Sequence, residues 1–197
     1  MVLIIPFFIV ALMVLSVISY SPNSPDNTQK SEYRGFTFVA DAENKLWNLD
    51  MAGKIYSFHT LPDQVEDINM SSSLNYVKYP EYTFEDRSDD LWTSDPQGSI
   101  QFVTQFVRTA LIQNGARVVE SLPLKYNAKG KTCVDASPSS AVIRFEQSNV
   151  TDVLNQNDCI VFRYETTQDL LRAKDAFLYR VLGVITKNAS RADYQID

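Results

Sequence analysis

The chain has 197 residues, of which 45% are hydrophobic and 21% charged, a composition that excludes a disordered protein and suffices for one packed domain. Its 18 basic and 24 acidic side chains give a net charge of −6 and a pI of about 4.8. Nucleic acid is therefore not expected as a partner, because few cations are available to neutralise phosphates. One histidine and two cysteines are one ligand short of a closed tetrahedral zinc site, and we expect no metal or other cofactor.

Residues 1–20 form an uncharged segment in which every residue from Met1 to Leu15 is apolar and Pro6 is the only helix breaker. A helix of this length measures about 30 Å, the thickness of a bilayer's hydrocarbon core. Two interpretations stay open, a retained transmembrane anchor and a cleaved signal peptide. The length favours the anchor, although residues 17–19 are compatible with a cleavage site. We predict a single-pass protein of the cell membrane whose domain faces outside, or a secreted protein if the segment is cleaved.

The polar, proline-containing residues 21–32 are typical of a linker. In an exported chain the two cysteines, Cys133 and Cys159, are expected to form a disulfide, and two buried free thiols are the alternative. Three N-x-S/T sequons also fit export, and their candidate glycosylation sites are Asn69, Asn149 and Asn188.

The first half of the folded region is predicted to be rich in strands. Three segments with partial alternation of apolar and polar residues indicate an antiparallel meander of three strands: Tyr33–Val39, Leu46–Leu49 and Lys54–Phe58. Residues 62–68 then favour a short helix that begins at a proline. Residues 76–79 and 82–84 resemble strands, and Pro80 between them indicates the edge of a sheet.

The second half has clearer signals. Apolar residues at helical spacing predict a helix over 99–113, which Asn114 and Gly115 end. Because only Arg108 is charged in it, this helix is expected to be buried on more than one side. Three further strands are predicted at 117–120, 141–145 and 159–164. A last helix begins at the capping box Thr166–Asp169 and closes at Gly183, and its expected core face is Leu170, Leu171, Phe177, Leu178, Val181 and Leu182.

These elements predict an α+β fold with a mostly antiparallel sheet and two long helices, preceded by the N-terminal hydrophobic helix, and one βαβ crossover near residues 99–120. The domain is expected to cover residues 33–185, and residues 186–197 to form a polar tail.

No catalytic residue is predicted. His59 follows a strand with no acid or nucleophile at a meaningful spacing, and we interpret it as structural. The acidic cluster Asp86, Asp89, Asp90 and Asp95 lacks the spacing of an EF-hand and indicates an acidic loop rather than a calcium site. Cys133 has Lys131 nearby as a base, but a disulfide would remove its thiolate. The aromatic cluster Tyr76, Tyr79, Tyr82 and Phe84 is interpreted as packing rather than as a recognition surface.

Several segments resemble uncharacterised, membrane-anchored archaeal proteins: residues 33–36, 46–47, 142–145, 158–162 and 173–183. The resemblance covers about half of the chain and rests on structural motifs. It implies an exported archaeal protein with an N-terminal hydrophobic segment, and it transfers no functional residues.

The function that we predict is that of a membrane-anchored, extracytoplasmic interaction or structural domain with a protein partner. Two alternatives remain: an exported hydrolase whose site is assembled from distant residues, and an accessory subunit of a membrane complex. A hydrolase predicts a polar pocket that holds carboxylates, whereas an interaction domain predicts an exposed apolar patch or sheet edge.

Overall fold

The first sheet is an antiparallel meander of four strands in sequential order: β1 (Lys30–Tyr33), β2 (Phe36–Asp41), β3 (Leu46–Met51) and β4 (Lys54–Phe58). The predicted strand 33–39 is divided by a two-residue turn at Arg34 and Gly35, whose φ angles of 47° and 85° suit a tight hairpin. The meander therefore has one strand more than predicted. Its first strand takes up residues 30–32, which the sequence analysis assigned to the linker.

The second sheet is mixed and has the strand order β5-β9-β10-β8-β6-β7. Its strands are β5 (Asn69–Met70), β6 (Glu81–Phe84), β7 (Arg117–Val119), β8 (Ser140–Gln147), β9 (Asp152–Gln156) and β10 (Cys159–Tyr164). Only the pair β9 and β10 is antiparallel. β6 and β7 are parallel neighbours joined through a helix, which confirms the predicted βαβ crossover.

The expectation that Pro80 marks a sheet edge is wrong, because β6 lies between β7 and β8. Pro80 immediately precedes the strand, so its missing N–H removes no hydrogen bond from the ladder. Its carbonyl oxygen accepts a hydrogen bond from the Arg117 N–H at 2.9 Å. Residues 76–78 lie outside the described part of the chain, and Tyr79 belongs to no strand.

Two helices of 15 residues confirm the predicted boundaries: α2 (Ser99–Gln113) and α3 (Thr167–Val181). The Thr166 hydroxyl accepts from the Asp169 N–H and the Asp169 carboxylate accepts from the Thr166 N–H, which is the predicted capping box. Gly183 ends the helix with a φ of 75°. In the described part of the chain the remaining helical turns are short 3₁₀ segments: η1 (Pro62–Gln64), where a longer helix was predicted, η2 (Ser72–Asn75) and η4 (Cys133–Asp135).

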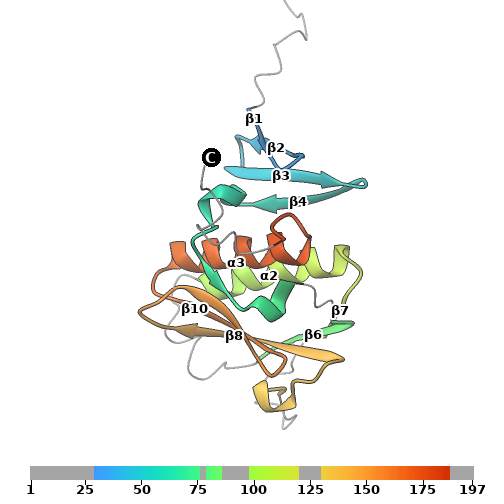
Figure 1. Cartoon of the computed structure of the whole chain (residues 1–197), viewed down its shortest axis with the longest axis vertical. Coiled ribbons are helices and arrows are strands. Elements are labelled where there is room, and N and C mark those ends of the chain that lie inside the picture. The colour runs from blue at the N-terminus through green and yellow to red at the C-terminus, as the bar shows by residue number, and fades with distance from the viewer. Residues whose placement is uncertain (1–28, 76–78, 86–97, 120–129, 187–197) are drawn as a thin grey trace, which may run out of the picture.

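The two helices form a layer between the two sheets (Figure 1). On one side of α3 the Tyr179 ring stacks on Phe58 of β4 with centroids 4.2 Å apart. On the other side Phe177 meets Phe162 of β10 at 5.2 Å. The predicted core face of α3 was therefore too narrow, since a sheet on each side buries every side chain from 173 to 180.

This computed structural model describes residues 29–75, 79–85, 98–119 and 130–186. The α+β fold with two long helices is confirmed; the antiparallel pairing is concentrated in the meander. The expected anchor and the tail at 187–197 lie outside the described residues. Neither α2 nor α3, nor another helix within the described ranges, is long and apolar enough to cross a membrane.

Candidate interaction surface

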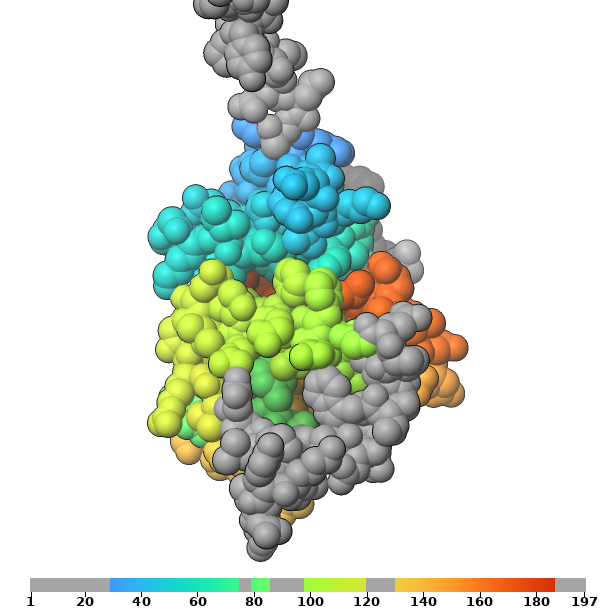
Figure 2. All heavy atoms as spheres, turned by 180° about the vertical axis from the view of Figure 1, so that it is seen from behind, coloured from blue at the N-terminus to red at the C-terminus, as the bar shows by residue number. Residues whose placement is uncertain are grey.

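Helix α2 presents an uncharged face to solvent. Its buried side, which includes Val103, Val107 and Leu111, packs into the layer between the sheets. Its exposed residues are Gln101, Phe102, Gln105, Thr109 and Ile112, which we call the α2 face. Figure 2 shows this helix, in yellow-green, at the surface below the meander. The expectation that α2 is buried on more than one side is thus not met within a single chain.

The two large apolar side chains of the α2 face are conspicuously exposed. Phe102 is 48% and Ile112 49% exposed. Ile55, on the neighbouring edge strand β4, is 59% exposed. Single exposed apolar residues are common on protein surfaces, but here three lie on adjoining elements around a helix that has one charged residue. Interfaces are depleted of charge at their centre in the same way.

A groove of about 260 Å³ separates the α2 face from β4. Its lining residues are Ile55, Tyr56, Ser57, Gln105, Phe106, Thr109, Ala110, Gln113 and Leu178. At one end the Lys54 ammonium donates to the Gln113 carbonyl oxygen at 2.5 Å, which ties the edge strand to the end of α2.

The groove is suited to apolar groups with a few neutral hydrogen bonds. Among its described lining residues the only ionisable group is the phenol of Tyr56, and burial raises the pKa of that phenol. Amide and hydroxyl groups of Gln105, Ser57 and Thr109 supply neutral donors and acceptors. The lining therefore holds no carboxylate, thiol or imidazole with which to perform hydrolysis.

A buried polar cluster lies behind Phe106. Lys174 and Asp175, adjacent on α3, are both fully buried and form an ion pair. The Lys174 ammonium also donates to His59 Nδ1 at 3.1 Å and lies 4.7 Å from the centroid of the Phe106 ring. Asp175 Oδ2 accepts from the N–H groups of His59 and Thr60 at 2.8 and 2.9 Å and from the Thr60 hydroxyl at 2.8 Å.

The geometry of this cluster assigns it a structural role. Because an ammonium only donates, His59 Nδ1 must be an acceptor, and the imidazole is therefore the neutral tautomer with its proton on Nε2. Burial, and secondarily the Lys174 charge, lower the pKa of His59, which keeps the ring neutral. One oxygen of Asp175 accepts hydrogen bonds from the main chain that follows β4, and these bonds attach α3 to the meander. The interpretation of His59 as structural is thus supported, although the sequence did not reveal its partners.

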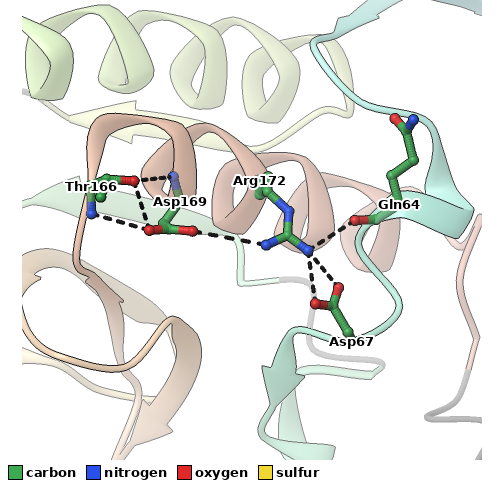
Figure 3. A network of polar contacts seen from close by, with 5 residues as sticks. All are labelled: Gln64, Asp67, Thr166, Asp169 and Arg172. Carbon is green, nitrogen blue, oxygen red and sulfur yellow. Dashed lines mark hydrogen bonds and ion pairs between the residues drawn. The ribbon is translucent and has the colours of Figure 1, made fainter.

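A third network fixes the start of α3 to the segment after η1 (Figure 3). The Arg172 guanidinium donates to both oxygens of the Asp67 carboxylate at 2.7 and 2.8 Å and to the Gln64 carbonyl oxygen at 3.1 Å. Asp169, which caps α3, lies 3.8 Å from the same guanidinium. These contacts are exposed and connect α3 with the chain that links the two sheets, so they position the layers rather than bind a ligand.

The predicted disulfide between Cys133 and Cys159 is confirmed, with Cα atoms 5.2 Å apart. It attaches η4 to the central strand β10 and leaves no thiolate for nucleophilic chemistry. Lys131, the candidate base for Cys133, instead donates to the Glu81 carboxylate at 2.8 Å. That contact and the Ser140 hydroxyl lower the pKa of Glu81.

The aromatic cluster packs inside the protein, as interpreted from the sequence. Tyr79 and Tyr82 are 3% and 2% exposed and meet edge to face, and Phe84 stacks on Phe145. Burial and a hydrogen bond to Asp158 raise the pKa of Tyr79 to about 12. Tyr76 lies outside the described residues.

Two of the three candidate glycosylation sites, Asn69 and Asn149, are exposed, whereas Asn188 lies outside the described residues. The acidic cluster Asp86, Asp89, Asp90 and Asp95 lies outside them as well. Within the described ranges, no three His, Cys, Asp or Glu side chains gather as metal ligands would.

Comparison of the chain with protein-family models, with curated proteins and with solved structures finds no match in any of the three.

Proposed function

We propose that this chain is a non-catalytic interaction domain, tethered to the outer side of the cell membrane by residues 1–20, and that the α2 face with the adjoining groove is its binding surface. The observation that carries the proposal is a solvent-exposed helix face without charge, on which Phe102 and Ile112 are each about half exposed. On a chain with a net charge of −6, such a face lowers the electrostatic cost of contact with another protein.

The chemistry of the surface favours binding over hydrolysis. A hydrolase needs a general acid or base and a nucleophile or activated water in an accessible cleft. The groove beside α2 is lined by apolar and neutral polar groups. The buried pair Lys174 and Asp175 behind the groove has no exposed surface. Its carboxylate and ammonium form an ion pair and hydrogen bonds with other groups of the fold.

The proposal is tested by the size of the native complex. We expect the full chain, extracted from its membranes in a mild detergent, to migrate on a native gel as a species larger than the 22.4 kDa protomer. The substitution Phe102→Glu should reduce that species to the protomer, because it replaces a large apolar side chain of the contact by a charged one.

Val150 offers a matched control, since it is 44% exposed and belongs to the turn between β8 and β9 rather than to α2. Val150→Glu should leave the complex intact. Migration of the wild-type chain as a protomer, or equal loss of the complex in both variants, would contradict the proposal.

A further inference from the structure

Four of the five exposed residues of α2 have a spacing that is the same in both chain directions, and Gln101, the fifth, lies outside this pattern. Phe102, Gln105, Thr109 and Ile112, which we call the seam, are separated by three, four and three residues. This is the spacing of a helix seam that packs against a second helix. Because it is palindromic, an antiparallel copy of α2 places Phe102 opposite Ile112 and Gln105 opposite Thr109.

The chemistry of the seam is complementary under that pairing. The outer pair is apolar on both sides, and each of its members is about half exposed in the protomer. The inner pair consists of an amide and a hydroxyl, both neutral, and each can donate to the other. The two-fold symmetry repeats both pairs, so four contacts arise from four residues per chain, as in an isologous interface.

The arrangement of the layers allows two tethered copies to meet in this way. Helix α2 runs across the long axis of the molecule, and β1, the strand nearest residues 1–28 in the chain, lies at one end of that axis (Figure 1). Helix α2 lies at the surface that faces the viewer in Figure 2, and this direction is perpendicular to the long axis. A two-fold axis parallel to the long axis therefore makes the two α2 helices antiparallel and keeps both β1 strands at the same end.

We propose that the partner of the α2 face is a second copy of this chain, held in an antiparallel α2–α2 pair in the register Phe102–Ile112 and Gln105–Thr109. This inference rests on the proposed function and names its partner. Each copy has a net charge of −6, and α2 supplies a contact without carboxylates. Two copies anchored in one membrane have a high effective concentration, which favours a contact made by a single helix pair.

A cysteine pair tests the register in membranes that contain the full chain. In the double variant Phe102→Cys with Ile112→Cys the two thiols of one chain are about 15 Å apart along α2, too far to bond with each other. We expect mild oxidation to convert most of the chain to a covalent species of twice the protomer mass. The control Phe102→Cys with Val150→Cys introduces the same number of thiols. It should give at least about fivefold less of the covalent dimer.

A charge exchange tests the same register without oxidation. Phe102→Glu alone and Ile112→Lys alone should each weaken dimerisation at least about tenfold in sedimentation of the detergent-solubilised full chain. The double variant should regain the dimer, because each Glu meets the Lys of the opposite copy and no pair within one chain is close enough to compensate. Both side chains are half exposed, so circular dichroism should show all three variants folded.

The outcomes separate this inference from the proposed function. A native complex that depends on Phe102 but contains a different protein, with no cross-link between positions 102 and 112, overturns the second copy and leaves the interaction domain in place. Cross-linking of Phe102→Cys alone as efficiently as the double variant overturns the antiparallel register. If the full chain, extracted from membranes in mild detergent, sediments and migrates as a protomer, both this inference and the proposed function are overturned.

Discussion

Replacing Asp175 by alanine should strongly destabilise the domain, because it breaks a buried ion pair and removes the acceptor of three hydrogen bonds at once. The carboxylate is fully buried, as is its partner Lys174. Without it the N–H groups of His59 and Thr60 and the Thr60 hydroxyl lose their acceptor. Loss of one partner of a buried pair costs about 3–5 kcal/mol, a large part of the roughly 5–15 kcal/mol that stabilises a domain.

The assay is urea unfolding of the chain from residue 29 onward, followed by far-ultraviolet circular dichroism. Thr60→Ala removes only one of the three donors and is the matched control, with an expected loss of about 1 kcal/mol. The double variant Lys174→Met with Asp175→Asn removes both charges while the amide oxygen still accepts, so it should be more stable than Asp175→Ala. A loss below about 1 kcal/mol in Asp175→Ala, or no recovery in the double variant, would refute the structural role of the cluster.

Three further predictions concern other parts of the chain. Substitution of Cys133 and Cys159 by serine should lower the free energy of unfolding by about 3–4 kcal/mol, because the bond closes a loop of 26 residues; an unchanged urea midpoint would contradict this. Because the pKa of His59 is lowered in the folded state, stability should be full above about pH 7 and fall as the pH drops below about 6.5, where only the unfolded chain binds the proton. His59→Gln should flatten that slope, and an identical pH profile in both proteins would exclude the histidine as its source. The full chain should stay with membranes after carbonate extraction, whereas the chain from residue 29 should be soluble; an N-terminus at Tyr20 in the native protein would show instead that the segment is cleaved.

The helices were the elements best predicted from the sequence, because their ends are encoded locally. Asn114 and Gly115 stop α2, and the Thr166 capping box starts α3. Strand β9 was not predicted, since Asp152-Val153-Leu154-Asn155-Gln156 shows no alternation. Backbone pairing with β10 and β5 holds β9 in the sheet. A contact between Asp152 and the Arg163 guanidinium on β10 accompanies that pairing, and sequence spacing does not reveal such a pair.

The sequence predicts the low charge of the candidate surface but not its exposure to solvent. Residues 99–113 contain one charged residue, Arg108, and this low charge predicts burial on several sides. Which side of α2 is covered depends on its packing against α3, β4 and β7, so the exposure of Phe102 and Ile112 appears only in three dimensions. The buried pair Lys174 and Asp175 was missed for the same reason, because charged residues within a helix pattern ordinarily indicate its solvent side.

The central claim is that the α2 face is covered by protein in the native membrane, and hydroxyl-radical footprinting of Phe102 measures this most directly. In the chain from residue 29 at high dilution, the ring should be oxidised at a rate that matches its 48% exposure. In membranes that contain the full chain, oxidation of Phe102 should fall several-fold while that of the half-exposed Val150 stays unchanged. Equal oxidation of Phe102 in both preparations would contradict the account.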